Sequence, residues 1–368
     1  MYKISRLITL ILVFLIILSN NNSKNLQVIR NNYKGQRVLN AVDYLIEKSN
    51  MEGIKSYKDG IQREMFFFNH SSKDNYNEYI DYRYIGNDAN NYVYFNCNDT
   101  EDLSTCELWR IIGVFINENF DGDRQYYLKI MRNDPIENIS WSDSSSSWEN
   151  STLFNYLNNG DYWYSLKGKF QNMIENTKFY DGQINNSMGL NELYFKEREH
   201  FTFAKVGLVS LSDYGFSYAN GVNEGCFNNI FNCSDNYNSW MNKHNNYWSL
   251  NSDNGSNTYV INNNVFKNSL NEFNSVYPTV YLKSNVGIES GNGSEGDAYV
   301  LRLLKKSSYL TEAEMLDSID DAGIKKEVYV DDTLSVVSIL SIVFSSGIII
   351  VGLLIIIYNF IKSKRELK

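Results

Sequence analysis

Aromatic rings interleaved with amide side chains are the residues of this sequence best suited to binding chemistry. Five of them lie in one Asn- and Ser-rich stretch: Trp240, Tyr247, Trp248, Asn251 and Tyr259. Rigid rings provide contact area at low entropic cost, and amides and hydroxyls orient a polar ligand. The stretch therefore predicts a surface that binds a sugar or a peptide. The alternative is that Trp240 and Trp248 are core residues, which is the favoured interpretation for Trp248.

Residues that could carry catalysis are few or unspecific. The three histidines are His70, His200 and His244, and no G-x-S-x-G nucleophile motif accompanies them. We therefore expect exposed histidines in loops, no catalytic residue and no cofactor. The 43 acidic residues could supply a pair for glycoside hydrolysis, but the sequence does not give the separation that such a pair needs. The glycine-rich stretch 290–297 lacks the Lys of a phosphate loop and the spacing of a calcium loop, so it predicts a solvated turn.

The four cysteines form two local pairs, Cys97 with Cys106 and Cys226 with Cys233. In an exported chain this spacing predicts two short disulfide loops, each stabilising the fold by roughly 2.5 kcal/mol. Zinc is the rival interpretation. The spacings C-x8-C and C-x6-C are not usual for zinc, and histidines are few, so we expect no metal.

The composition limits the class of protein and of partner. The chain has 368 residues, of which 43% are hydrophobic and 15% aromatic, enough to bury a sizeable core. Its net charge of -9 argues against nucleic acid as a partner, because phosphate binding needs a basic face.

The two ends predict a membrane topology. Lys3 and Arg6 precede an apolar run at 7–18, which is typical of a signal peptide or an uncleaved N-terminal anchor. Residues 334–361 carry no charge and are followed by a basic tail, which is typical of a transmembrane helix with a cytoplasmic C-terminus. We expect a single-pass protein of the cell membrane whose residues 24–333 lie outside the cell.

Periodicity and turn residues predict the elements that must position these side chains. Helices are expected at 37–49, after a Ser151 cap and at 165–176, and a further one at 312–320 in a charged stalk. Strands are expected at 92–95, 108–115, 126–131, 203–211 and 276–282, and the second and third of these are expected to be neighbours.

Several strings in the chain resemble a group of surface proteins of Gram-positive anaerobic bacteria. These strings are Asp81-Tyr82-Arg83-Tyr84-Ile85-Gly86, Asn91-Tyr92-Val93-Tyr94-Phe95-Asn96-Cys97, Cys106-Glu107-Leu108-Trp109-Arg110-Ile111-Ile112-Gly113-Val114-Phe115, Val206-Gly207-Leu208, Ser212-Asp213-Tyr214-Gly215 and Pro278-Thr279-Val280-Tyr281-Leu282-Lys283-Ser284. The ectodomain of that group is similar to the C-type-lectin-like superfamily, which includes the formylglycine-generating enzymes and variable receptor-binding domains.

This resemblance covers about residues 80–302 and implies an α+β domain. A small twisted antiparallel sheet, two helices and long loops would present the ligand surface. The chain departs from the group's pattern at Tyr277 and at 248–252, and it lacks the calcium-binding signatures of sugar-binding C-type lectins. Calcium-dependent sugar binding and the cysteine chemistry of the enzymes are therefore not carried over.

Together these observations divide the chain into six parts: 1–23, signal peptide or anchor; 24–79, N-terminal helix and polar segment; 80–303, C-type-lectin-like ectodomain; 304–333, stalk; 334–361, transmembrane helix; and 362–368, cytoplasmic tail. The expected function is that of a membrane-anchored extracellular binding or adhesion protein with a glycan or protein ligand. Two alternatives are an extracellular hydrolase and a structural or pilus-like surface subunit. The sequence does not indicate an oligomeric state.

Overall fold

The computed structural model describes residues 40–49, 65–70, 80–306 and 329–330, apart from 186, 219–223, 234–238, 243–244 and 254. The chain separates into two units, 39–328 and the combination of 1–38 with 329–368. The second unit contributes the short strand β19 (Tyr329–Val330). The predicted signal segment, the stalk helix, the transmembrane helix and the basic tail lie outside the described residues. Among the helices that are described, none is long and apolar enough to cross a membrane.

A long antiparallel hairpin forms the centre of the unit 39–328. It consists of β4 (Glu107–Glu118) and β5 (Arg124–Arg132), which pair from Trp109↔Arg132 to Glu118↔Arg124. Nine consecutive residues of β4 are buried, because its β-branched and aromatic side chains are covered on both faces. The expectation that these two strands are neighbours is confirmed.

Around this hairpin the described residues form a ten-stranded sheet, with the order β10-β15-β5-β4-β3-β17-β16 and three branch strands. The flanking strands are β3 (Tyr92–Phe95), β10 (Val206–Gly207), β15 (Thr279–Leu282), β16 (Val286–Ser290) and β17 (Tyr299–Leu303). The branch strands are β1 (Met65–Asn69), β2 (Ile80–Tyr84) and β7 (Ile174–Glu175). The 290–297 stretch connects β16 to β17, and Gly291 and Gly293 there adopt positive φ angles, as the predicted turn requires.

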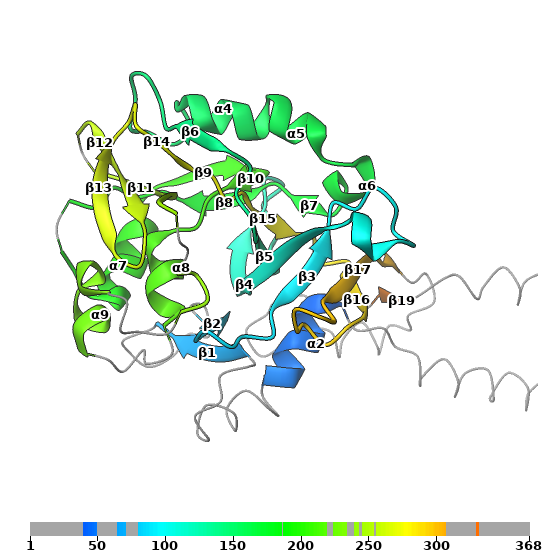
Figure 1. The fold of residues 1–368 in the computed structure, drawn as a ribbon. Coiled ribbons are helices and arrows are strands. Elements are labelled where there is room, and N and C mark those ends of the chain that lie inside the picture. The colour runs from blue at the N-terminus through cyan, green and yellow to red at the C-terminus, as the bar shows by residue number, and fades with distance from the viewer. Residues whose placement is uncertain are drawn as a thin grey trace, which may run out of the picture. The chain divides into compact units, whose positions relative to one another are not determined.

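A second, five-stranded sheet has the order β13-β12-β11-β14-β6. Its strands are β6 (Asn138–Ser140), β11 (Tyr247–Ser252), β12 (Asn257–Ile261), β13 (Val265–Ser269) and β14 (Phe273–Ser275). A separate two-stranded ribbon pairs β8 (Thr177–Tyr180) with β9 (Phe201–Ala204). In Figure 1 the second sheet lies to one side of β4 and β5, next to the helices α7 (Leu190–Glu197) and α8 (Leu211–Phe216).

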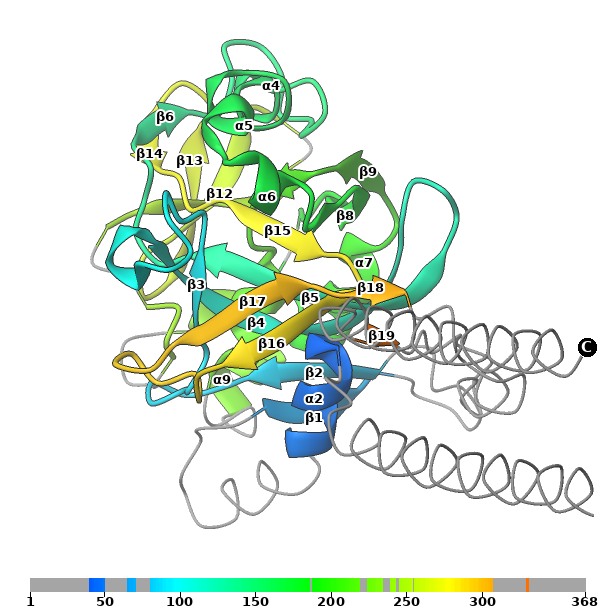
Figure 2. The ribbon, with the colours of Figure 1, turned by 90° about the vertical axis from the view of Figure 1, so that its right-hand side faces the viewer.

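Two of the expected helices are present, and one begins at its predicted cap. The helix expected at 37–49 corresponds to α2 (Ala41–Lys48), which begins after Asn40 and buries Ala41, Val42 and Leu45; the Asn40 side chain accepts a hydrogen bond from the Asp43 N–H. Figure 2 shows α2 beside β16. In α4 (Thr152–Asn158) the Ser151 Oγ accepts from the Phe154 N–H at 2.9 Å. Residues of α2 and β1, which precede the ectodomain boundary expected at 80, contribute to the same hydrophobic core as the rest of this unit.

The prediction of a single helix at 165–176 is wrong. The chain instead forms α5 (Asp161–Ser165), an extended turn at Leu166 and Lys167, α6 (Gly168–Gln171) and then β7. Gly168 is a poor helix former, and pairing with β15 draws Ile174 into the main sheet opposite Leu282.

The prediction of a single strand at 203–211 is also wrong, because this stretch contains two short strands and the start of a helix. The chain passes from β9 to β10, and Ser210 then begins α8 with a capping box in which the side chains of Ser210 and Asp213 each accept from the other residue's backbone N–H. The strand expected at 276–282 shortens to β15, which starts after Pro278. The remaining short elements are η3 (Leu103–Thr105), α9 (Glu224–Asn228), η4 (Ile230–Asn232) and β18 (Lys305–Lys306).

These elements give a mixed α+β protein, as expected, and the described part is mostly sheet. The main sheet is larger than the small antiparallel sheet that was expected, and β17 pairs with β3 in parallel. The core contains many large aromatic residues: Trp109 is fully buried, and Trp141, Trp148 and Trp248 pack edge-to-face or tilted with ring centroids 5.3–5.9 Å apart.

Candidate functional site

A cleft of about 440 Å³ opens beside the end of α7. Its lining comes from the segment 181–185, which follows β8, from Lys196, Glu199 and His200 at and after the end of α7, and from Ser252 at the end of β11. Ser147 and Trp148 complete it. Apart from the Trp148 ring, the lining consists of hydroxyl, amide, carboxylate, ammonium and imidazole groups, with Gly182 between them.

An Asp–His pair lies in this cleft. The Nδ1 atom of His200 is 2.6 Å from Asp181 Oδ1, and the Thr202 hydroxyl donates to Asp181 Oδ2 at 2.7 Å. The Asp181 side chain is only 3% exposed, whereas that of His200 is 58% exposed. Because an ionised carboxylate only accepts, Nδ1 carries the proton and the Nε2 atom of a neutral ring is an acceptor. The buried carboxylate thus orients an accessible imidazole.

A close backbone approach fixes the position of Asp181. The Gly182 N–H donates to the Glu197 carbonyl at 2.9 Å, and the Asp181 N–H donates to the His200 carbonyl at 3.2 Å. A Cβ atom at Gly182 would lie 2.3 Å from the Lys196 carbonyl oxygen, so only glycine allows this contact. The end of α7 and the 181–182 segment are therefore held together directly beneath the cleft.

A charged pair and two amides complete the polar lining. Lys196 and Glu199 form an ion pair one helical turn apart, and both line the cleft. Gln183 and Asn185 are exposed and also line the cleft. The buried indole Nε1 of Trp148 has no hydrogen-bond partner within the described residues.

The five ligand-binding residues expected from the sequence are all in the interior. Trp240, Tyr247, Trp248, Asn251 and Tyr259 are at most 5% exposed, so they present no surface to a ligand in this structure. This corrects the expectation of an exposed aromatic surface and confirms the alternative that Trp240 and Trp248 are core residues.

The polar atoms of these side chains are satisfied by the backbone, which explains why they can be buried. Trp248 Nε1 donates to the Ile139 carbonyl at 2.7 Å, and Trp240 Nε1 donates to the Tyr84 carbonyl at 3.0 Å. The Tyr247 hydroxyl donates to a backbone carbonyl at 2.9 Å, and the Tyr259 hydroxyl to another at 2.5 Å. Asn251 Oδ1 accepts from the Leu211 N–H at 2.8 Å and so joins β11 to α8.

The cysteine prediction is confirmed. Cys97 is bonded to Cys106, and Cys226 to Cys233. The first disulfide closes the loop before β4, and the second joins α9 to the end of η4. Neither lines the cleft described above.

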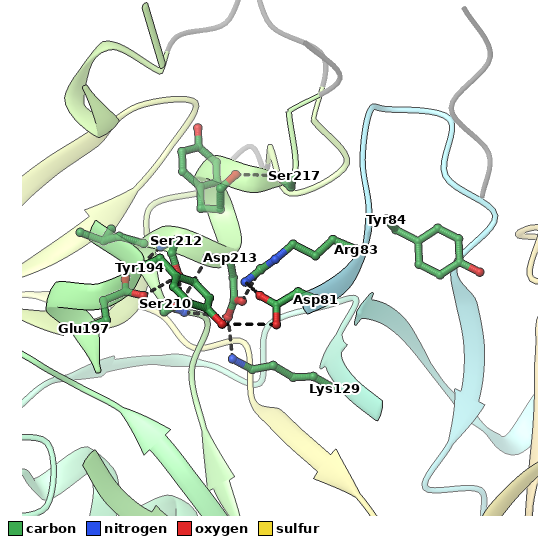
Figure 3. A network of polar contacts seen from close by, with 12 residues as sticks. Asp81, Arg83, Tyr84, Lys129, Tyr194, Glu197, Ser210, Ser212, Asp213 and Ser217 are labelled. Atoms are coloured by element: carbon green, nitrogen blue, oxygen red, sulfur yellow. Dashed lines mark hydrogen bonds and ion pairs between the residues drawn. The ribbon is translucent and has the colours of Figure 1, made fainter. Parts of the chain in front are cut away.

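A buried cluster of charges lies behind α7, between the main sheet and α8. Figure 3 shows Asp81, Arg83 and Lys129 converging around Asp213. Arg83 bridges the two carboxylates, with 2.8 Å to Asp81 Oδ2 and 2.8 Å to Asp213 Oδ1. Lys129 Nζ lies 2.6 Å from Asp213 Oδ2. All four side chains are at most 5% exposed, so their charges are compensated by one another and by neighbouring protein groups rather than by water.

The charges in this cluster determine the ionisation of its members. Burial opposes ionisation of Asp213, but the charges of Lys129 and Arg83 outweigh it and lower the pKa of this carboxyl. Burial lowers the pKa of Lys129, although Asp213 opposes this effect. The guanidinium of Arg83 has a raised pKa because its two carboxylate partners outweigh its desolvation. We therefore assign ionised states to both carboxylates and to Arg83.

Glu197 connects the charge cluster to the cleft. Its carboxylate accepts from the Ser212 N–H at 2.9 Å and from the Ser212 hydroxyl, and its backbone carbonyl holds Gly182. Burial raises the pKa of Glu197 to about 7, an effect that the Ser212 hydrogen bonds oppose. A buried carboxyl that titrates near neutral pH thus lies at the end of the helix that carries Lys196.

The expectation of exposed histidines is wrong for His70. Its Nε2 atom lies 3.0 Å from Asp81 Oδ2, and its ring stacks on Tyr194 with centroids 3.7 Å apart. His200 is exposed but belongs to the Asp–His pair, and His244 lies outside the described residues.

Among the described residues, no group of three or more His, Cys, Asp or Glu side chains is arranged to hold a metal ion. No protein-family model matches the chain, and no curated protein or solved structure matches it either. The case for a function therefore depends on the cleft and its lining.

Proposed function

We propose that this protein is a membrane-anchored extracellular binding protein with a C-type-lectin-like ectodomain, and that it binds a polar, hydroxyl-rich ligand such as a glycan in the cleft beside α7. The observation that carries the proposal is the chemistry of the cleft, whose exposed lining combines hydroxyls, amides and a charged pair. Sugars are recognised by such groups because each sugar hydroxyl needs a hydrogen-bond donor or acceptor.

The polar lining also argues against an apolar ligand. A purely apolar ligand would leave most of these hydroxyl, amide and charged groups unpaired, which costs binding energy.

The location outside the cell is proposed on three grounds. They are the uncharged segment 334–361 followed by a basic tail, the apolar N-terminal run, and the two disulfides, which form and persist in oxidising compartments. The C-type-lectin-like architecture is proposed from the family strings together with the mixed α+β fold, in which a long stretch between β10 and β15 leaves the main sheet and returns to it.

A binding experiment tests the cleft. The full-length protein in detergent is screened against a glycan array, and the variant Gln183→Trp fills the mouth of the cleft from an exposed position. The matched control is Asn155→Trp, which adds the same ring to an exposed position of α4 outside the cleft. We expect Gln183→Trp to lower glycan affinity at least tenfold and the control to bind normally. Equal binding by both variants would place the ligand elsewhere.

A second experiment tests the topology. Intact cells are treated with protease, and the fragments released are identified by mass spectrometry. Peptides from 80–303 should be released while the C-terminal tail stays protected. A chain that is fully protected in cells that remain intact would contradict the extracellular location.

A further inference from the structure

The Asp181–His200 pair has a geometry that ligand binding alone does not require. A hydrogen bond from a neutral or charged imidazole to a ligand needs only an exposed ring. Here a buried carboxylate, itself held by the Thr202 hydroxyl and by backbone contacts, fixes both the orientation and the tautomer of His200. Such support is characteristic of a general base, because proton transfer depends on which nitrogen carries the proton.

The second ring nitrogen of His200, Nε2, is available to accept a proton. Nδ1 is committed to Asp181, and no partner of Nε2 occurs among the described residues. The ring lies on the lining of the cleft with more than half of its side chain accessible. A water molecule within hydrogen-bonding reach of Nε2 could therefore be deprotonated while a ligand occupies the same cleft.

The cleft also supplies a positive charge to stabilise the intermediate. Lys196 lines the same cleft, and its partner Glu199 is largely exposed, so a ligand oxyanion would compete with that carboxylate for the ammonium group. Developing negative charge on a carbonyl oxygen is the species that a nearby cation or N–H donor stabilises. Both carboxylates of the cleft are already paired, Asp181 with His200 and Glu199 with Lys196. The base and the cation that they position suit hydrolysis of an acyl ester better than cleavage of a glycosidic bond, which uses two carboxylic groups on the substrate itself.

We propose that the cleft hydrolyses acyl esters on a hydroxylated ligand, with His200 as the general base, Asp181 as its positioning residue and Lys196 as the oxyanion partner. This rests on the proposed function only in that it uses the same cleft. The oxygen of a water molecule bonds to the acyl carbon while its proton passes to Nε2 of His200. The tetrahedral intermediate then collapses, the ester C–O bond breaks, and the leaving alkoxide takes that proton from Nε2. The products are a carboxylic acid, which loses its proton to solvent, and an alcohol.

Hydrolysis of 4-nitrophenyl acetate by the full-length protein in detergent tests the proposal, because this probe requires no particular sugar. We expect many turnovers per molecule, and His200→Asn should lower the rate by about 10²- to 10⁴-fold. The Asn side chain can still donate an N–H to the buried Asp181 carboxylate, so this variant should stay folded, which its unfolding temperature checks. Asn155→Ala on α4 should keep the parental rate. A single stoichiometric burst, or an unchanged rate in His200→Asn, would overturn the proposal.

The role of Asp181 has its own measurement. The chain has only three histidines, so ¹⁵N-histidine labelling gives a simple spectrum in which each tautomer can be assigned. We expect the neutral His200 ring to carry its proton on Nδ1. Asp181→Asn should both shift this proton to Nε2 and slow the hydrolysis.

Ser147→Ala tests whether the attacking group is water. A loss of activity equal to that in His200→Asn would overturn the water route.

The two proposals for the cleft can fail separately. If the glycan array succeeds while hydrolysis fails, only the hydrolytic proposal falls. Hydrolysis without glycan binding contradicts only the binding function.

Discussion

Removal of the Asp213 charge is the sharpest test of how the charge cluster behind α7 holds the fold. In Asp213→Asn the shape and one acceptor oxygen are retained, but Lys129 and Arg83 lose the carboxylate that they share at 2.6 Å and 2.8 Å. At such distances and an effective dielectric constant of about 20, each pair contributes about 6 kcal/mol of attraction before desolvation is counted. Since the lost carboxylate's own desolvation cost disappears with it, we expect a net decrease of about 3–5 kcal/mol in the free energy of unfolding.

Urea unfolding followed by tryptophan fluorescence measures this change, because Trp141, Trp148 and Trp248 are buried and their emission reports the packed core. The matched control is Glu118→Gln, which removes a carboxylate from a surface pair with Lys178 at 2.9 Å and should cost less than about 1 kcal/mol. Both proteins should be compared with their disulfides intact and with the same detergent.

A double variant separates electrostatics from packing. In Asp213→Asn/Lys129→Met the unpaired ammonium is gone, and Arg83 keeps Asp81 as its partner. The double variant should therefore be more stable than the sum of the two single changes predicts, by about 1–3 kcal/mol. Strict additivity, or a loss below about 1 kcal/mol in Asp213→Asn, would refute the argument that the cluster is held by mutual charge compensation.

Three further outcomes are expected. Trp248→Ala should lower the free energy of unfolding by about 3–5 kcal/mol because it leaves a cavity beside Trp141; a variant with parental stability and lost ligand binding would instead return Trp248 to a ligand-binding role. The pKa of Glu197 is raised from 4.5 to about 7, so the folded state holds this proton where the unfolded chain has lost it. The free energy of unfolding should therefore decrease as the pH rises from about 4.5 to about 7. Glu197→Gln should remove this decrease, which urea unfolding at several pH values measures. Replacing Cys226 and Cys233 by Ser should cost roughly 2.5 kcal/mol in thermal or urea unfolding, whereas no change would mean that the loop is already restricted in the unfolded chain.

Local signals predicted much of the fold. The β4–β5 hairpin follows from two runs of β-branched and aromatic residues separated by polar turn residues, and α4 follows from the Ser151 cap. The predictions failed where a long-range contact competed with a local pattern. Leu166, Phe170 and Ile174 have helical spacing, yet pairing with β15 takes Ile174 into the sheet. The chemical environment of a residue thus depended on partners more than a hundred positions away.

The candidate site depended entirely on contacts that no local sequence pattern predicts. Asp181 and His200 are 19 residues apart and belong to no motif, so composition and spacing could not distinguish His200 from His70, which is buried. Aromatic residues misled the prediction for a related reason. A Trp or Tyr suits a binding surface and a core equally well if a backbone carbonyl accepts its polar hydrogen, and Trp248 and Tyr259 both find one.

The buried charges and the cleft are linked through one helix end, which gives the cluster a role apart from stability. Buried ion pairs contribute little net stability because desolvation offsets their attraction, but their hydrogen bonds permit only one arrangement of the groups. Here Asp213 caps α8 and binds the sheet through Lys129 and Arg83, and the adjacent Ser212 holds the side chain of Glu197. The carbonyl of Glu197 in turn holds Gly182 beside Asp181. The backbone beside the carboxylate that positions His200 is therefore connected by hydrogen bonds to the main sheet, and we expect a change in the cluster that leaves the protein folded to alter the cleft.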